Sequence, residues 1–148
     1  MNKNQQHKNN SVMLLNERKS EMRKYAEKLI QKGVNIADPE RIDFRGECIF
    51  GDNISIDINV IFEGKVELGD NVSIGANCII TDSKVGAHST IKPFSLVEGA
   101  VVGANTFIGP YGRIRSGTIL MDSVPVSYTH LRAHETPEHL VCRLLLEK

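Results

Sequence analysis

The sequence predicts an all-β fold, a left-handed parallel β-helix (hexapeptide repeat) of about four coils, preceded by one α-helix. Three features of residues 50–124 predict it: large apolar residues recur about every six residues, glycines follow many of them, and small or β-branched residues lie between. Neither an α-helix nor a hairpin sandwich has this period. A triangular β-helix does, because each six residues form one short strand and one turn.

Thirteen large apolar residues carry the period, and twelve steps of six or five residues separate them. Three hexapeptides make one turn of such a prism, so residues 50–124 supply about four coils and can bury a core. The thirteen are Phe50, Ile56, Phe62, Leu68, Ile74, Ile80, Val85, Ile91, Val97, Val102, Ile108, Ile114 and Leu120.

The residues between these positions fit a narrow triangular interior. Glycines directly after the large residues are expected to adopt positive φ at tight corners. They are Gly51, Gly69, Gly75, Gly86, Gly103 and Gly109. Short side chains are expected inside the prism beside the large ones. They are Val60, Val66, Val72, Cys78, Ser89, Ser95 and Thr106.

The part before the repeats divides into three segments. Residues 1–11 are polar and are expected to be disordered. Residues 12–33 form a connecting helix in this prediction, with Gly33 as its stop. Residues 34–49 form a junction, in which Asp38 and Pro39 predict a capped turn. The apolar side of the helix is Met22, Tyr25, Ala26, Leu29 and Ile30.

Charge and composition exclude several classes of protein. The chain has 18 Lys and Arg against 18 Asp and Glu, with a net +5 over residues 1–33 and a net −5 over 34–124. The basic segment lacks aromatic residues that would stack on bases, so we expect no nucleic-acid partner. No apolar run suits a membrane span or a signal peptide, so a cytoplasmic protein is expected, with Cys48, Cys78 and Cys142 as reduced thiols.

Residues 125–148 differ in composition from the rest of the chain and are expected to be a non-native tail. Back-translation of 126–136 resembles a transposase sequencing adapter read in one frame, and 139–146 continue it. The tail contains His130, His134, Glu135 and His139. A zinc-binding HExxH motif is excluded, because His134 and His139 are five residues apart with Pro137 between them.

Longer stretches of sequence indicate a family. The segments AEKLIQKGVNIADPERIDFRG, ISIDINVIFEGKVELGDNVSIGANCII and IKPFSLVEGAVVGANTFIGPYGRIRSG resemble the bifunctional N-acetylglucosamine-1-phosphate uridyltransferase/glucosamine-1-phosphate acetyltransferase family, over residues 26–120. The resemblance implies a β-helix domain that transfers acetyl from acetyl-CoA to glucosamine 1-phosphate. It also implies an N-terminal domain that uses UTP and Mg²⁺, and a homotrimer with acetyltransferase sites between neighbouring prisms. The pathway product is UDP-N-acetylglucosamine.

The resemblance assigns few site residues to this chain. Arg115, in GRIRSG, matches the arginine that binds the sugar phosphate, and Ser116 replaces the proline that usually follows. Asn9, or Asn10, matches an asparagine that helps hold Mg²⁺. The family's catalytic histidine, with its tyrosine, lysine and asparagine, lies beyond Leu120. No catalytic residue is therefore expected here, and the chain is expected to be an inactive fragment. His88 is expected to be a turn residue, because Ile91 stands where the family has tyrosine.

Three alternatives remain open. Another hexapeptide acyltransferase is disfavoured by the runs DPERIDFRG and GPYGRIR. A zinc hydratase of this fold needs three imidazoles, and the repeats contain only His88. A non-catalytic β-helix scaffold would need a cap after the last coil to cover its unpaired strands.

Overall fold

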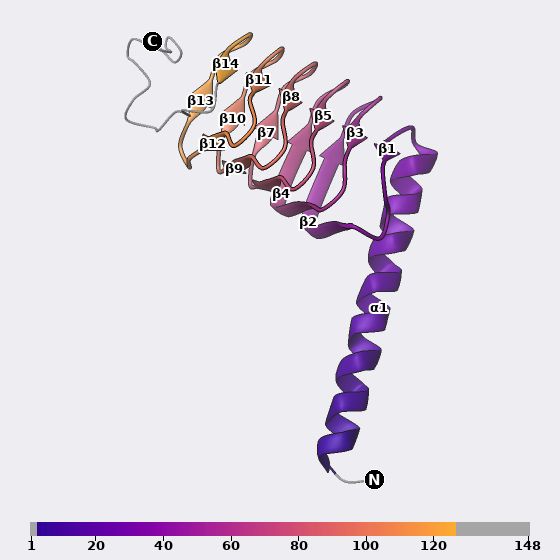
Figure 1. The fold of residues 1–148 in the computed structure, drawn as a ribbon. Helices are drawn as coiled ribbons and strands as arrows, with labels where there is room; N and C mark the ends of the chain where they lie inside the picture. The colour runs from indigo at the N-terminus through magenta and orange to yellow at the C-terminus, as the bar shows by residue number, and fades with distance from the viewer. Residues whose placement is uncertain (1–2, 127–148) are drawn as a thin grey trace.

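The structure is a computed structural model that describes residues 3–126. Figure 1 shows one long helix, α1 (Lys3–Gln31), joined at its C-terminal end to a stack of short strands. All strand pairs are parallel, and each coil of the chain lies on the one before it. The predicted fold class, a left-handed parallel β-helix after one helix, is confirmed.

One side of the prism, here called the β14 face, is a sheet of six strands. They follow one another every 17–20 residues, so the chain completes five turns between the first strand and the last. The predicted four coils over residues 50–124 are present, and one further coil precedes them. The strands are β1 (Asn35–Ile36), β3 (Ser55–Ile56), β5 (Ser73–Ile74), β8 (Thr90–Ile91), β11 (Phe107–Ile108) and β14 (Pro125–Val126).

The other two sides belong to one bent sheet. Its long strands β2 (Ile42–Phe50) and β4 (Val60–Leu68) pair along nine residues and continue around a corner of the prism. Before the corner, the first half of β4 leads to β6 (Ile79–Thr81), β9 (Leu96–Glu98) and β12 (Arg113–Ile114), which form the β12 face. After the corner, its second half leads to β7 (Lys84–Val85), β10 (Val101–Val102) and β13 (Ile119–Leu120), which form the β13 face.

The prism begins earlier than the sequence analysis placed it. Residues 34–49 were predicted as a junction, but β1 and most of β2 lie in this segment and already pair with the next coil. The apolar residues Ile36 and Ile42 supply the core there, outside the strict six-residue spacing. The predicted turn is present, because Asp38 Oδ1 accepts the N–H of Glu40 at 2.9 Å and its carbonyl accepts that of Arg41 at 3.0 Å.

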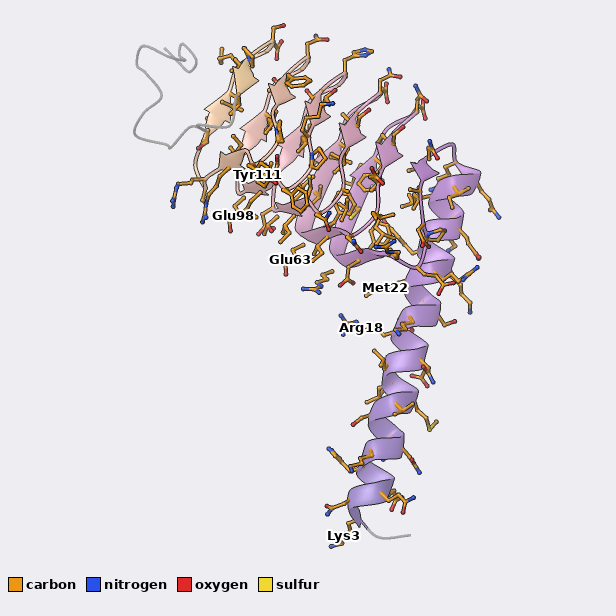
Figure 2. The ribbon with its side chains drawn as sticks, viewed as in Figure 1. Lys3, Arg18, Met22, Glu63, Glu98 and Tyr111 are labelled. Carbon is orange, nitrogen blue, oxygen red and sulfur yellow. The ribbon has the colours of Figure 1, made fainter. Side chains whose placement is uncertain are left out.

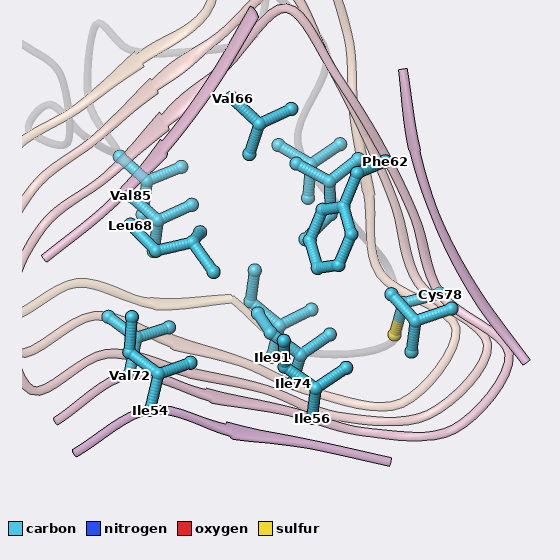
Figure 3. Close-up of a cluster of buried hydrophobic side chains, with 14 of the residues drawn as sticks. Ile54, Ile56, Phe62, Val66, Leu68, Val72, Ile74, Cys78, Val85 and Ile91 are labelled. Atoms are coloured by element: carbon cyan, nitrogen blue, oxygen red, sulfur yellow. The ribbon is translucent and has the colours of Figure 1, made fainter. Parts of the chain in front are cut away.

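Apolar side chains fill the centre of the triangle. Figure 3 shows Phe62 and Leu68 from the bent sheet pointing toward Ile56 and Ile74 of the β14 face. Of the thirteen predicted large core residues, twelve are buried and Phe50 packs against them. The seven predicted small interior residues are buried as well. Burial of this kind supplies about 25 cal/mol per Å² of apolar surface, which makes it the main stabilising contribution.

The prediction that glycines directly after the large core residues supply positive φ at the corners of the prism was wrong. Most positive φ angles fall on asparagine and other non-glycine residues: Asn53, Asn59, Asn71, Asn77, Asp82, His88, Phe94, Asn105, Tyr111 and Ser123. The predicted corner glycines do not have positive φ. Several of these positions are glycine because a neighbouring coil leaves no room for a Cβ atom. A Cβ on Gly69 would lie 2.7 Å from the backbone nitrogen of Ala87, and one on Gly103 would lie 2.6 Å from that of Asp122.

Three buried serines six residues apart connect one coil to the next. Ser83, Ser89 and Ser95 each occupy a different corner of the interior. Their hydroxyl oxygens accept backbone N–H groups of the following coil at 3.0–3.2 Å and donate to carbonyls at 2.7–3.1 Å. Buried polar groups are tolerated when they are satisfied in this way.

Helix α1 begins at Lys3, so the prediction of disorder over residues 1–11 was wrong for residues 3–11. This stretch has no glycine or proline and contains Lys and Gln, which are good helix formers, so it continues the helix while fully exposed. The helix ends as predicted near Gly33, whose φ is 100°. No helix among residues 3–126 is long and apolar enough to cross a membrane.

The C-terminal end of α1 packs on the first coil. Ala26 and Leu29 are buried, and Tyr25 meets Phe44 edge to face with ring centroids 4.7 Å apart. Tyr25 also donates its hydroxyl hydrogen to the carbonyl of Cys48 at 3.2 Å. Residues 127–148, which include most of the predicted non-native tail and its histidines, lie outside the described residues.

Candidate functional site

The outward side chains of the β12 face form columns, because each coil repeats the register of the one below. One column runs along the edge where the face meets the β13 face. Arg45 pairs in register with Glu63, Glu63 with Thr81, and Thr81 with Glu98. Arg113 pairs with Leu96 and Ile114 with Val97, which puts Arg115 beside Glu98 at the top of this column. Figure 2 shows Glu63 and Glu98 along one edge of the stack.

Arg115, the predicted phosphate-binding residue, follows directly after β12 and is exposed. Its carbonyl accepts the N–H of Thr118 at 3.1 Å, which fixes the backbone of the turn. Within residues 3–126 its guanidinium has no hydrogen bond or ion pair. A guanidinium held on a firm turn and without an internal partner can bind a phosphate through two N–H groups.

Charges in the lower part of the column are already paired. Arg45 lies 2.7 Å from Asp43 and 3.6 Å from Glu63. Thr81 donates its hydroxyl hydrogen to Glu63 at 3.3 Å. Glu98 has no such partner among the described residues. The unpaired charges of the column are therefore at its top, where Glu98 and Arg115 lie side by side.

Two stacked aromatic rings occupy the other edge of the same face. Phe94 and Tyr111 lie one above the other, with centroids 5.3 Å apart and planes 9° apart. Both are more than half exposed and both have positive φ, 64° and 61°. Positive φ is unusual for bulky side chains, and the stacking contributes to holding these two in place. Figure 2 shows Tyr111 on the same side of the stack as Glu98.

His88 is a turn residue, as predicted. It is exposed with φ 63° at the corner between β7 and β8, and its N–H donates to the carbonyl of Asp70 at 2.8 Å. Arg115 follows β12, in a different coil and near a different corner. The structure therefore does not bring the imidazole to the candidate phosphate site.

Asn9, the predicted Mg²⁺ ligand, lies in the exposed N-terminal part of α1. The first carboxylate along the helix is Glu17, two turns further on. In residues 3–126 no group of three or more His, Cys, Asp or Glu side chains could hold a metal ion. Mg²⁺ is bound through carboxylates or phosphates, so the residues around Asn9 do not fit the ion by themselves.

The two described cysteines are free thiols without nucleophilic character. Burial raises the pKa of Cys48 to about 12, with a smaller contribution from the charge of Glu47. Burial also raises the pKa of Cys78, whose thiol donates to the carbonyl of Lys92 at 3.2 Å. Neither thiol forms the thiolate required for nucleophilic attack at neutral pH.

Known proteins match the chain over most of its length. The profile described as "GMPPB C-terminal domain" matches residues 44–134, more than half of the chain. The chain belongs to this family. Among relatives, "Bifunctional protein GlmU" of Janthinobacterium sp. (strain Marseille) is 42% identical over 138 residues, and that of Burkholderia thailandensis is 45% identical over 118. The protein of the same name from Nitrosospira multiformis is 48% identical over 101 residues.

These matches confirm the predicted resemblance to a bifunctional enzyme and cover 68–89% of this chain. The chain in turn spans only 22–30% of the length of these relatives. The family match continues to residue 134, into the segment from 125 onward that was predicted to be non-native. The origin of that segment stays a prediction.

Glu98 and the Phe94–Tyr111 stack were not singled out from the sequence. A signal for them was present: residues 17 positions apart fall in the same column in these coils, so Glu98 aligns with Arg115 and Phe94 with Tyr111. Recognising it requires knowing which steps of the repeat contain five residues rather than six.

Proposed function

We propose that this chain is part of a bifunctional N-acetylglucosamine-1-phosphate uridyltransferase/glucosamine-1-phosphate acetyltransferase. Its prism would be the first part of the acetyltransferase domain, and Arg115 would bind the phosphate of glucosamine 1-phosphate. Identities of 42–48% to the GlmU relatives support the assignment to this enzyme. The exposed, unpaired guanidinium after β12 is the observation that supports the phosphate site.

Arg115 would act on binding rather than on the acetyl transfer. A planar guanidinium donates two parallel hydrogen bonds to phosphate oxygens and keeps its charge at all working pH values. The acetyl donor would be acetyl-CoA, which supplies an activated thioester when bound. Within residues 3–126 no histidine lies beside Arg115, whose neighbour in register is Glu98, so the general base would come from other sequence.

The remaining parts of the proposed enzyme follow from the family resemblance. UTP and Mg²⁺ would be used by a nucleotidyltransferase domain preceding α1, in a homotrimer. Flat prism faces can pack around a threefold axis, which is compatible with the trimer. Asn9 alone does not make a Mg²⁺ site, so its contribution would depend on carboxylates or phosphates of that other domain.

Steady-state kinetics of the protein encoded by the source gene test this function. We expect acetyl-CoA-dependent acetylation of glucosamine 1-phosphate. Arg115→Ala should raise the KM for glucosamine 1-phosphate by about tenfold or more with little change in kcat, because it removes a charge-assisted hydrogen bond made in the ground state. Arg41→Ala is the matched control, since Arg41 is an exposed arginine at the opposite end of the stack. Equal KM values for both variants would contradict the role of Arg115.

A further inference from the structure

A groove separates α1 from the first two coils of the prism. Its volume is about 400 Å³, and its lining includes Leu15, Arg18, Lys19 and Met22 of α1 with Asp43 and Ile61 of the prism. Figure 2 shows Arg18 and Met22 pointing from α1 to the side on which the prism lies. The helix residues share one face of α1, because they are three or four positions apart.

Contacts at the C-terminal end of α1 hold the two walls of the groove together. Tyr25 packs on Phe44 and donates its hydroxyl hydrogen to the carbonyl of Cys48, and Arg23 forms an ion pair with Glu40. A partner that enters the groove therefore meets walls that are already in place, which lowers the entropic cost of binding.

The middle of the groove is apolar and open to solvent. Leu15 is 48% exposed, and Met22 and Ile61 are half-buried. Leu15 and Met22 are two helical turns apart, about 10 Å along α1. A second helix with apolar side chains at every third or fourth position fits such a stripe. A flat lipid surface does not, because the stripe lies in a recess between α1 and the prism.

The free charges on the helix wall are positive. Within residues 3–126 the side chains of Arg18 and Lys19 have no hydrogen bond or ion pair. On the prism wall, the carboxylate of Asp43 is neutralised by Arg45 at 2.7 Å. Two unpaired cations beside an apolar stripe are complementary to a partner that is both apolar and acidic.

One polar atom of the prism wall also lacks a partner. Oδ1 of Asp43 is buried and accepts no hydrogen bond from the described residues, whereas Oδ2 accepts one from Arg45 at 2.8 Å. Buried polar atoms are normally satisfied. An N–H or hydroxyl group of a polypeptide can supply the missing donor, and an acyl chain cannot.

We propose that this groove binds an acidic amphipathic helix of a partner protein. Apolar side chains of that helix cover Leu15 and Ile61, and its carboxylates accept hydrogen bonds from Arg18 and Lys19. The groove is at the opposite end of the stack from Arg115, so the inference goes beyond the proposed function and does not depend on it.

Fluorescence anisotropy on the protein encoded by the source gene tests the proposal. The probe is a labelled peptide of about 18 residues, long enough to form a helix, with leucine at every third or fourth position and glutamate elsewhere. A matched peptide has glutamine in place of every glutamate. The acidic peptide should bind about tenfold more tightly, because only its carboxylates make charge-assisted hydrogen bonds.

Charge variants locate the binding surface. The double variant Arg18→Gln with Lys19→Gln should weaken the acidic peptide about tenfold and leave the neutral peptide unchanged. The control is Lys24→Gln with Lys28→Gln, two exposed lysines of α1 outside the groove, which should change neither dissociation constant.

An apolar pair of variants tests the stripe. Leu15→Gln should weaken both peptides, whereas Leu14→Gln, an exposed neighbour outside the groove, should weaken neither. Absence of binding, equal affinity for the two peptides, or equal effects of a variant and its control would overturn the proposal. So would binding to phosphatidylglycerol vesicles without binding to the peptide, which would make α1 a membrane-binding surface. The acetylation assay of Arg115→Ala tests the proposed function separately.

Discussion

The hydroxyl oxygen of Ser89 accepts the backbone N–H of Thr106 from the next coil, at 3.0 Å, in the fully buried interior of the prism. The same hydroxyl donates to the carbonyl of Gly103 at 2.9 Å. Ser83 and Ser95 repeat the arrangement at the other two corners. One coil is therefore joined to the next by three polar side chains inside a core whose other side chains are mostly apolar.

Ser89→Ala should destabilise the protein. The substitution leaves the buried N–H of Thr106 without an acceptor, which costs about 1–3 kcal/mol. The midpoint of thermal unfolding should fall by about 2–4 °C for each kcal/mol. Ser73→Ala is the control, because Ser73 is exposed on the β14 face and its loss should cost less than about 0.5 kcal/mol. Equal shifts for the two variants would show that the buried hydroxyl does not stabilise the stack.

Gly64→Ala and Gly117→Ala distinguish the cost of backbone strain at positive φ from the cost of crowding by a neighbouring side chain. Both glycines have positive φ at the corner between the β12 and β13 faces. A Cβ on Gly117 meets no atom within 4 Å, whereas one on Gly64 would overlap Oδ1 of Asp82, which accepts the N–H of Lys65 at 3.0 Å. Urea unfolding should therefore show a cost of about 1–2 kcal/mol for Gly117→Ala and about 1–2 kcal/mol more for Gly64→Ala. The same cost at both positions would contradict the crowding.

Tyr25 couples α1 to the prism through its ring and its hydroxyl. Tyr25→Phe removes only the hydrogen bond to the carbonyl of Cys48 and should cost about 1 kcal/mol in urea unfolding. Tyr25→Ala also removes the ring contact with Phe44 and should cost about 2–3 kcal/mol. If the phenylalanine variant loses as much as the alanine variant, the ring contact does not contribute.

Cys48 should make the fold less stable in alkaline solution. Burial raises the pKa of this thiol from its ordinary value of 9.0 to about 12, so the unfolded chain releases the proton at lower pH than the folded protein does. The contribution of Cys48 to the free energy of unfolding is fully present below about pH 9 and is lost as pH rises toward about 12. Unfolding free energies of wild type and Cys48→Val, compared over this range, should fall more steeply for wild type. Parallel curves would mean that the thiol does not titrate differently in the folded state.

Much of the prism could be predicted from the sequence, because its core repeats. The position of Ile80 or Val97 follows from counting six residues at a time, and both are buried. The first coil was missed, since Ile36 and Ile42 precede the regular period and lie in a segment with a turn at Asp38. The helix start was missed because residues 3–11 bury nothing, so no apolar pattern marks them.

The corners and the site were harder to predict, for a geometric reason. Asparagine at Asn53 and Asn71 supplies positive φ where glycine was expected, and glycine at Gly69 is required by a neighbouring coil that sequence reasoning cannot place. Arg115 was assigned by family resemblance alone. Its neighbour Glu98 became visible only from the register of β9 and β12.

Long-read sequencing of the source gene, upstream of Met1 and through the codon of Val124, tests the central claim most directly. The proposed function predicts one reading frame that runs from a nucleotidyltransferase domain, through this helix and prism, into further hexapeptide coils. Those coils should carry the lysine, histidine and tyrosine of an acetyltransferase site. A gene that begins at Met1 and ends after Lys148 would contradict it, and would leave a β-helix without either catalytic site.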